Sequence, residues 1–288
     1  MPQTWLITGS SRGLGRALAE AAVAAGHNVV ATARRPVDLE GAYPVALDVT
    51  DAEQARAAVA AAVERFGRLD VVVNNAGYAN VSSIEDFAEE DFRAQLETNL
   101  WGVVNVTRAA LPVLREQGAG HIIQISSVGG RSSAPGLGPY QTAKWAVEGF
   151  SGVLAKEVNP LGIKVTVVEP GGFRTDWAGS SMTVQEFNPA YDASVGAMMR
   201  YRESAVALGD PVKAAQAILT VADAEEPPLQ LLLGSDAFAL ARSVDEARIA
   251  SDDRWKPLTL STDHDDADPA GIERARELTA SRGTGSRP

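Results

Sequence analysis

The sequence predicts an α/β fold in which helices cover both faces of one parallel sheet. Strand-like and helix-like segments alternate from the start of the chain to about residue 233. Apolar runs such as Val71–Val73 show no polar alternation, which is typical of strands buried on both faces. A glycine-rich turn joins the first strand-like run to the first helix-like segment. These observations predict a single doubly wound domain of the Rossmann type, with three αβα layers.

Short apolar runs predict the strands, and longer segments bounded by capping residues predict the helices. Gly26 and Gly67 end the first two helices, and Thr50 is the expected N-cap of the second. In chain order the expected elements are a strand at Trp5–Ile7, a helix at Leu14–Ala25, strands at Val29–Ala31 and Tyr43–Val49, a helix at Asp51–Phe66, a strand at Val71–Val73, a helix at Glu89–Gln117, a strand at His121–Ile125, a helix at Tyr140–Asn159, a strand at Ile163–Val168, a helix at Pro211–Ala222 and a strand at Leu229–Leu233.

Charge and composition argue against several classes of function. A formal net charge of −11 argues against a nucleic-acid binder, which needs a basic surface to meet the phosphates. The chain has no cysteine, so disulfides, thiol catalysis and thiolate metal sites are excluded, and its three scattered histidines favour no metal site. No signal peptide is visible and no apolar run is long enough to cross a bilayer. We therefore expect a cytoplasmic protein without a membrane partner.

The glycine-rich turn, Thr8–Gly15, has the features of a phosphate-binding site. Glycines let the backbone turn tightly and approach a phosphate, while the start of the following helix supplies amide donors and a partial positive charge. The spacing of its glycines differs from GxGxxG and from a Walker loop. The alternative is a plain turn between a strand and a helix. Its position after the first strand favours a dinucleotide site.

The charge at the end of the second strand indicates which dinucleotide binds. An acidic residue there would accept hydrogen bonds from the ribose hydroxyls of NAD. Here Arg34 follows the strand instead, and Arg12 in the glycine-rich turn is expected to reach the same space. Guanidinium groups form charge-assisted hydrogen bonds with phosphate. The pair predicts NADP(H), unless both arginines are only solvated surface charges.

Tyr140 and Lys144 are candidates for acid–base chemistry because residues four apart share one face of a helix. A lysine ammonium favours the phenolate and is expected to lower the phenol pKa from its usual value of about 10. Ser126 and Ser127 end the preceding strand and offer hydroxyl groups to a substrate oxygen. Taken alone, each feature has a simpler interpretation: a chance pair on a solvated helix, and serines that only form a turn.

Together these residues resemble the short-chain dehydrogenase/reductase family in its single-domain form, over about residues 4–233. The active-site serine of the family matches Ser127, thirteen residues before Tyr140. The matching motifs are TGxxxGxG at Thr8–Gly15, NNAG at Asn74–Gly77, NxxG at Asn99–Gly102, YxxxK at Tyr140–Lys144, and PG with its following threonine at Pro170, Gly171 and Thr175.

The resemblance implies a role for each matching residue. Tyr140 would exchange the proton with the substrate oxygen, and Ser127 would polarise that oxygen. Lys144 would bind the nicotinamide ribose, and Asn99 would hold a water of the proton relay. The implied cofactor-binding residues are Gly9, Ser11, Arg12, Gly13, Leu14, Arg34, Asp48, Val49, Asn75, Ala76, Gly77, Tyr140, Lys144, Pro170, Gly171, Phe173 and Thr175.

The remaining chain suggests a lid and a tail. Residues 1–260 are expected to form the dinucleotide-binding catalytic domain, with a substrate lid at about 171–207, and residues 261–288 a flexible or loosely packed tail. Aromatic and methionine side chains in the lid suggest an apolar pocket, or ordinary packing of the lid. The expected substrate is a hydrophobic carbonyl compound or alcohol, of a steroid-like or polyketide-like kind. The lid residues concerned are Trp177, Met182, Phe187 and Tyr191.

The resemblance also implies a homodimer or homotetramer, paired through the helices at Glu89–Gln117 and Tyr140–Asn159. Two other functions remain open on the same scaffold. One is a nucleotide-sensing regulator that has lost catalysis, against which the intact candidate catalytic residues argue. The other is a lyase or epimerase that retains its nicotinamide. Net consumption of NADPH with substrate would separate a reductase from both.

Overall fold

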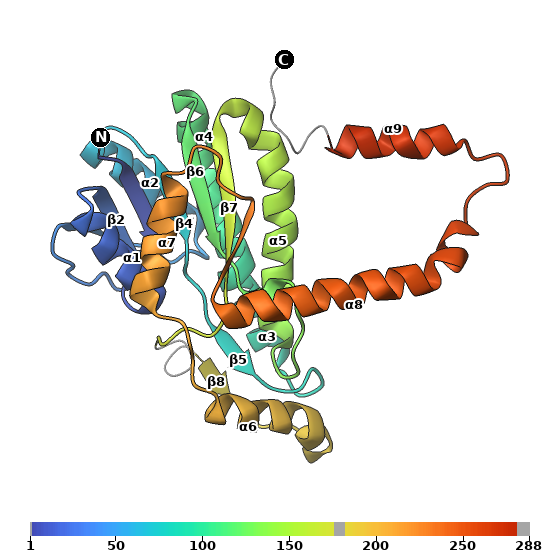
Figure 1. Cartoon of the computed structure of the whole chain (residues 1–288). Helices are drawn as coiled ribbons and strands as arrows, with labels where there is room; N and C mark the ends of the chain where they lie inside the picture. The colour runs from blue at the N-terminus through green and yellow to red at the C-terminus, as the bar shows by residue number, and fades with distance from the viewer. Residues whose placement is uncertain (1, 176–181, 281–288) are drawn as a thin grey trace.

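The computed structural model describes residues 2–175 and 182–280. Within them, seven parallel strands form one sheet in the order β3-β2-β1-β4-β6-β7-β9 (Figure 1). The strand order reverses between β1 and β4, where ligands of doubly wound folds bind at the carboxyl ends. The strands are β1 (Thr4–Thr8), β2 (Asn28–Ala33), β3 (Ala42–Ala46), β4 (Val71–Asn74), β6 (Gly120–Ile125), β7 (Ile163–Pro170) and β9 (Gln230–Leu233).

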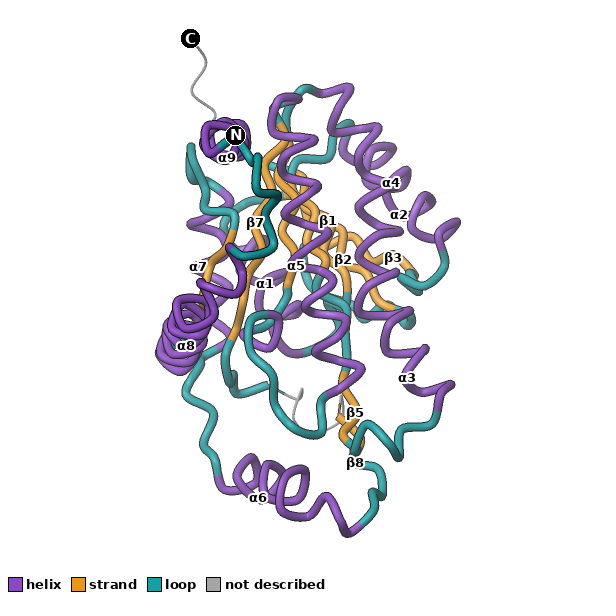
Figure 2. Tube along the Cα trace, turned by 90° about the vertical axis from the view of Figure 1, so that its right-hand side faces the viewer, coloured by secondary structure: helices purple, strands orange, loops and turns teal. Residues whose placement is uncertain are grey.

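Helices cover both faces of this sheet, which confirms the predicted three-layer fold (Figure 2). Adjacent residues of a strand point to opposite faces. Thus Ile7 packs in the core beneath α1 (Gly13–Ala24) and α7 (Pro211–Ala222), whereas Leu6 packs in the other core. That second core lies beneath α2 (Ala52–Phe66), α4 (Gly102–Gln117) and α5 (Gly138–Val158).

Two helices differ from the prediction. Asp51, not Thr50, caps α2: its Oδ1 accepts hydrogen bonds from the backbone N–H groups of Glu53 and Gln54 at 2.8 and 3.1 Å. A carboxylate at that position also interacts favourably with the positive end of the helix dipole. The long helix expected at Glu89–Gln117 is divided into α3 (Glu89–Leu96), a π-helical turn at Glu97–Trp101, and α4.

A second, two-stranded parallel sheet lies beside the carboxyl ends of the main strands, and the sequence did not predict it. It pairs β5 (Ala79–Val81) with β8 (Met182–Val184), the latter from the lid segment. The lid continues through short turns into α6 (Ala197–Ser204), which lies on the same side of the molecule (Figure 1). Because each strand has only three residues, their apolar pattern is too short to predict.

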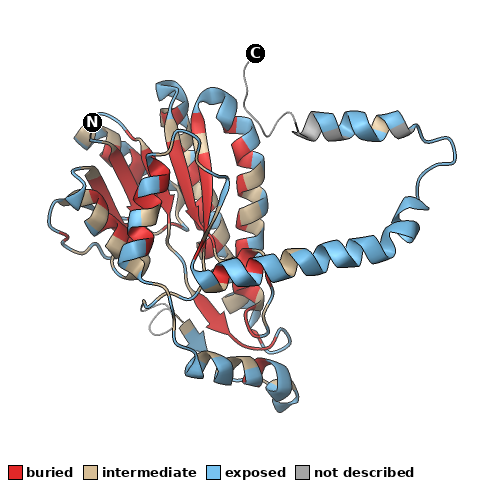
Figure 3. Cartoon of the chain, in the orientation of Figure 1, coloured by how far each residue is buried: buried red, intermediate tan, exposed pale blue. Residues whose placement is uncertain are grey.

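The carboxyl-terminal region is helical. The 26-residue helix α8 (Ser235–Leu260) starts against the domain, where Ala237 and Ala241 are buried, and then extends away from it (Figure 3). The segment expected to be a loose tail contains a further helix, α9 (Pro269–Ala280). Residues 281–288 of the expected tail lie outside the described residues. Within the part of the chain that the structure describes, no helix combines the length and apolar character needed to span a membrane.

Candidate active site

The glycine-rich turn leaves β1 at Thr8 and enters α1 at Gly13. Gly9 and Gly13 have positive φ angles of 67° and 58°, a conformation that side chains disfavour. A Cβ at Gly9 would lie 2.9 Å from the Ala76 Cα, and one at Gly15 would lie 2.5 Å from the Gly9 carbonyl oxygen. The sequence therefore needs glycine here for both conformation and space. The turn presents the start of α1 towards the carboxyl edge of the sheet.

The end of β4 is tied directly to this turn. The Thr8 Oγ1 accepts hydrogen bonds from the backbone N–H groups of Asn75 and Ala76, at 2.9 and 3.0 Å. The Asn75 Nδ2 donates to the carbonyl oxygens of Thr8 and Gly9, at 2.9 and 3.2 Å. The side chain of Asn75 thus holds the glycine-rich turn in shape, and Gly77 follows at the mouth of the same cleft. The order of the two motifs in the sequence did not reveal this connection.

The two arginines expected to select the cofactor are exposed. Arg34 directly follows β2, and Arg12 occupies the N-cap position of α1. The pKa of the Tyr78 phenol is raised by burial and then by the Asp91 carboxylate, and the Arg34 guanidinium opposes this rise. Arg34 therefore stands near Tyr78, which immediately follows Gly77.

Asp48, which is expected to bind the adenine, forms hydrogen bonds with the nearby Thr50. Its Oδ1 accepts hydrogen bonds from the Thr50 backbone N–H at 3.0 Å and from the Thr50 hydroxyl at 2.8 Å. Val49 is buried. A Cβ placed on Gly102 would lie 2.5 Å from the Val49 Cγ2, so these two residues are in close contact. Ser11 is half-buried in the glycine-rich turn, and Leu14 packs against the core beneath α1.

The candidate catalytic tyrosine and lysine are buried at the start of α5. The Tyr140 phenol is hydrogen-bonded to the Ser127 side chain, and its residue is 6% exposed. The Lys144 Nζ lies 5.6 Å from the centre of the Tyr140 ring and donates to the Ile125 carbonyl oxygen at 2.8 Å. Because Ile125 is the last residue of β6, this bond fixes the lysine to the strand that carries the serine.

The pKa of the Tyr140 phenol differs from the expectation of a lowered value. Burial raises it to about 12, while the hydrogen bond from Ser127 and the positive charge of Arg202 oppose that rise. Burial also lowers the pKa of Lys144 to about 8, against the effect of Glu148, which raises it. Desolvation thus outweighs the attraction expected within the Tyr140–Lys144 pair. Among the described residues, the cation that lowers the phenol pKa is Arg202 of α6, and not Lys144 of α5.

Asn99 lies in the π-helical turn and is fully buried. Its Nδ2 donates to the carbonyl oxygens of Tyr78 and Gln95, both at 2.9 Å, and its Oδ1 accepts from the Tyr78 backbone N–H at 3.1 Å. A Cβ on Gly77 would lie 2.5 Å from this Oδ1 and 3.8 Å from the Lys144 Nζ. The π-helical turn therefore brings Asn99 beside Gly77 and near Lys144.

The segment after β7 closes the site on the side of the glycine-rich turn. A Cβ on Gly13 would lie 3.6 Å from the Thr175 Cβ, so the two segments meet. The backbone N–H of Gly171, which follows Pro170, donates to the Leu233 carbonyl oxygen at 2.9 Å. The Phe173 ring, in contrast, packs on Gly209 and the core beneath α1. Asp236, which accepts from the Gly172 N–H at 2.7 Å, supports this segment and was missed from the sequence.

The described residues of the segment expected to form a lid contribute apolar side chains to the cluster around Tyr140. Val195 and Leu137 are buried in this cluster, and Met199 packs against it. Met182, Phe187 and Tyr191 also pack against it, as expected for an apolar lining, whereas Trp177 lies outside the described residues.

Arg202 follows Met199 by three residues on α6, and Met199 follows Val195 by four, so the three side chains lie along one side of this segment. Arg202 is half-buried, while its neighbours Tyr201 and Glu203 are exposed. Its side chain therefore faces the Tyr140 cluster, which agrees with its effect on the phenol pKa.

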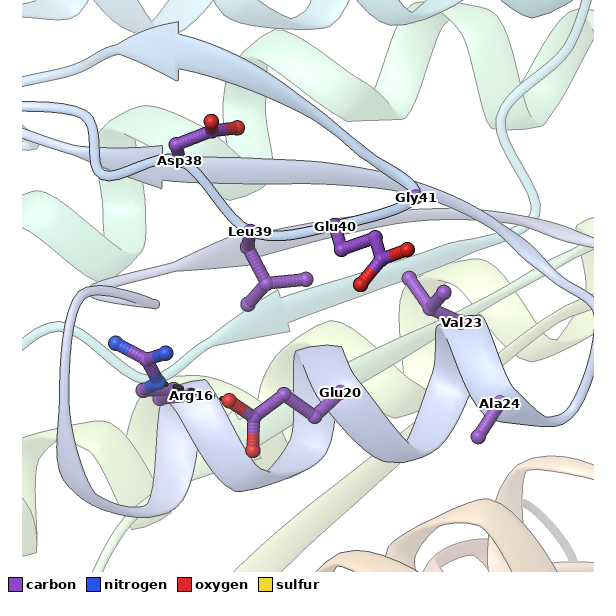
Figure 4. Close-up of a pocket in the computed structure, with 8 residues that line it drawn as sticks. All are labelled: Arg16, Glu20, Val23, Ala24, Asp38, Leu39, Glu40 and Gly41. Atoms are coloured by element: carbon purple, nitrogen blue, oxygen red, sulfur yellow. Dashed lines mark hydrogen bonds and ion pairs between the residues drawn. The ribbon is translucent and has the colours of Figure 1, made fainter.

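A separate hollow lies between α1 and the loop before β3 (Figure 4). In it, the Arg16 guanidinium is paired with Glu20 at 2.8 Å, and Asp38 and Glu40 add further negative charge. None of the predicted site residues lines this hollow. The candidate active site is therefore the group of residues at the carboxyl ends of the strands, and not this hollow.

Comparisons with known proteins identify several relatives of this chain. The family model described as short chain dehydrogenase matches residues 3–186. The chain is 53% identical to the oxidoreductase BOA17 of Botryotinia fuckeliana, over 91% of this chain and 100% of that protein. The crystal structure of a short-chain dehydrogenase from Streptomyces avermitilis has a TM-score of 0.85 and 41% identity, covering 92% of this chain and 100% of that one.

Two further crystal structures, each 25% identical to this chain, contain different dinucleotides. A short chain dehydrogenase from Burkholderia cenocepacia is in complex with NADP, with a TM-score of 0.70 and coverage of 88% of this chain and 99% of that chain. A 3-ketoacyl-(acyl-carrier-protein) reductase from Brucella melitensis is complexed with NADH, with a TM-score of 0.69 and coverage of 80% and 96%.

Proposed function

Because this chain belongs to the short-chain dehydrogenase family, we propose that it is an NADP(H)-dependent oxidoreductase acting on a carbonyl group or the matching secondary alcohol. The observation that carries this proposal is that Ser127, Tyr140 and Lys144 lie together beside Gly77, at the end of β6 and the start of α5. Members of this family use nicotinamide cofactors.

The residues present fit a dinucleotide. Gly9 and Gly13 leave the backbone bare where a phosphate would approach, and the start of α1 supplies amide donors. Arg34 and Arg12 are exposed near the end of β2, where a 2′-phosphate would be bound. The family includes proteins crystallised with NADP and with NADH, so the preference for NADP(H) rests on these two guanidinium groups.

The chemistry follows from the protonation states of the buried groups. When bound, the nicotinamide supplies or accepts the hydride. With a pKa raised to about 12, the Tyr140 phenol is protonated near neutral pH and is set up to donate its proton to a developing alkoxide. The Ser127 hydroxyl orients the same oxygen. A protonated Tyr140 is the form that carbonyl reduction requires, and the proposal therefore includes ketoreductase activity.

Lys144 and Asn99 support the reaction from the cofactor side. The Lys144 ammonium, fixed by the Ile125 carbonyl, would bind the nicotinamide ribose. The Asn99 amide holds Tyr78 and Gly77 in place, and a water held beside it would return a proton to Tyr140 through Lys144. No step assigned to these residues requires a metal.

The apolar cluster around Tyr140 supports a hydrophobic substrate, such as a ketone of steroid-like or polyketide-like character. Exposed apolar side chains at Trp101, in the π-helical turn before α4, and at Val153, on α5, support a homodimer or homotetramer through this region. A cytoplasmic location remains a prediction.

The test is a screen of the purified full chain against ketones, aldehydes, steroids and sugars, with NADPH and with NADH, following the loss of reduced cofactor. Oxidation of NADPH that depends on a ketone is the expected result. NADPH binding without turnover across the panel would instead favour a nucleotide-sensing regulator. Conversion of a substrate with no net loss of NADPH would favour a lyase or epimerase.

A further inference from the structure

A buried ionic cluster lies behind the candidate active site, between β7 and α5. Glu169, on β7, has a side chain with no exposed surface. The Arg131 Nε lies 2.9 Å from its Oε1 and 2.8 Å from its Oε2. Glu148, one helical turn after Lys144, reaches the same place from α5 and accepts a hydrogen bond from the Gln230 Nε2 of β9 at 2.9 Å. Two carboxyl groups therefore share one arginine.

The two carboxyl groups also contact each other. Burial raises the pKa of Glu169 to about 7. The hydrogen bond and charge of Arg131 oppose this rise, and the Glu148 carboxyl adds to it, through its charge and then through a side-chain hydrogen bond. The Glu169 Oε2 and the Glu148 Oε1 are both buried, and neither receives a well-directed hydrogen bond from another described residue. Two carboxylate oxygens cannot bond to each other unless one of them carries a proton.

We propose that Glu148 and Glu169 share one proton and, with Arg131, form a neutral cluster that positions Lys144 from behind. With one proton shared, one negative charge remains against the single positive charge of Arg131. Loss of the proton would leave two buried negative charges against one cation, which is unfavourable in a site of low polarity. The cluster fixes the middle of α5, and hence the helical turn that carries Lys144, to the end of β7.

Helix α8 is anchored to the same cluster. The Arg131 Nη1 lies 3.7 Å from the Asp245 Oδ2, and the Arg131 carbonyl oxygen accepts a hydrogen bond from the Arg248 Nη2 at 3.2 Å. The Arg248 guanidinium stands 4.6 Å from the ring centre of Trp145, the residue after Lys144. The charged groups around the carboxyl pair are thus Arg131, Lys144 and, at the exposed rim, Asp245 with Arg248.

The shared proton is tested on the full chain without cofactor, by infrared spectroscopy of the protonated carboxyl band near pH 6. Wild-type protein is expected to show this band, and both Glu169→Gln and Glu148→Gln are expected to lose it. In each variant the amide donates to the remaining carboxylate, which no longer needs a proton. The matched control is Asp245→Asn, which leaves the pair intact and the band in place. The proposal is overturned if the wild-type protein shows no such band, or if the band is still present in both the Glu169→Gln and the Glu148→Gln variants.

Thermal unfolding measured across pH distinguishes a shared proton from a purely structural role of the two carboxyl groups. Because the pKa of Glu169 is raised in the folded protein, the folded protein still holds a proton between pH 4.5 and about 7. The unfolded chain has already released that proton in this range. This contribution to stability therefore falls as pH rises through that window. The melting temperature of Glu169→Gln relative to wild type is expected to rise over the same range. A difference that stays constant with pH contradicts a shared proton.

The effect on Lys144 rests on the proposed function and is measured separately. Glu148 raises the pKa of Lys144, so Glu148→Gln is expected to shift the alkaline limb of the pH profile of kcat/KM to lower pH. Glu157→Gln, an exposed change on the same helix, should leave the profile unchanged. An unshifted limb in an active Glu148→Gln enzyme refutes the positioning role. If the chain reduces no carbonyl, the infrared and unfolding results still decide the shared proton.

Discussion

The phenol of Tyr140 shows how burial and charge compete at a single residue. Burial favours its neutral form, and the Ser127 hydrogen bond and the Arg202 charge only partly offset this preference. From the sequence, Tyr140, Lys144 and Ser127 could be identified as a set, because their spacing is local. The direction of the phenol pKa could not, because it depends on desolvation by residues such as Leu137 and on a lid arginine far along the chain.

The role of Arg202 can be measured through the pH dependence of alcohol oxidation, which needs the phenolate. Replacing Arg202 with methionine removes a charge that lowers the phenol pKa, so the rise of kcat/KM with pH should move to higher pH. Arg200→Met is the control, because Arg200 is exposed and paired with Asp192 at 2.8 Å. An unchanged profile for the Arg202 variant would show that this guanidinium does not act on Tyr140.

The proposed preference for NADP(H) can be tested at a single residue, Arg34. Loss of one charge-assisted hydrogen bond to a 2′-phosphate costs about 1.5–3 kcal/mol. Arg34→Ala should therefore weaken NADPH binding by roughly 10- to 100-fold and leave NADH binding almost unchanged. Titration calorimetry with both cofactors measures this, with the adjacent exposed Arg35→Ala as control. Equal losses for the two cofactors would remove the basis for NADP(H) selection.

At the scale of elements, the sheet and its covering helices could be predicted because short apolar runs alternate regularly with longer segments that end in capping residues. Three features could not. The pairing of β5 with β8 joins segments about a hundred residues apart, and each strand is only three residues long. The π-helical turn depends on side-chain bonds of Asn99, and the course of α8 depends on Arg131 and Arg248. All three rest on contacts that the sequence does not place side by side.

The π-helical turn should depend on Asn99 as a positioning residue. Asn99→Ala removes the partner of the buried Gln95 carbonyl and of the half-buried backbone N–H and carbonyl of Tyr78. This should cost about 1–3 kcal/mol of unfolding free energy and disturb Gly77. Denaturant unfolding measures the first effect and NADPH affinity the second. Glu97→Ala, exposed in the same turn, is the control. Wild-type stability in the Asn99 variant would mean that the turn is held by other contacts.

At the scale of the whole molecule, the topology explains why distant motifs meet. The strand order reverses between β1 and β4, so the glycine-rich turn and the Asn75–Gly77 segment open at one edge of the sheet. β6 and β7 are next in order and bring Ser127 and Gly171 to the same edge. The net charge of −11 is spread over the surface, while the cleft itself contains Lys144 and Arg202. An overall acidic protein can thus present a locally cationic site.

The most direct test of the account is to compare cofactor binding and turnover in the full-length Tyr140→Phe variant. This change removes only the hydroxyl, so the fold and the dinucleotide cleft should be retained. We expect ketone-dependent oxidation of NADPH to fall by about 100- to 10,000-fold, with NADPH affinity within a few-fold of wild type. If the variant instead reduces ketones at a rate close to that of wild type, Tyr140 is not the proton donor and the proposed mechanism is wrong.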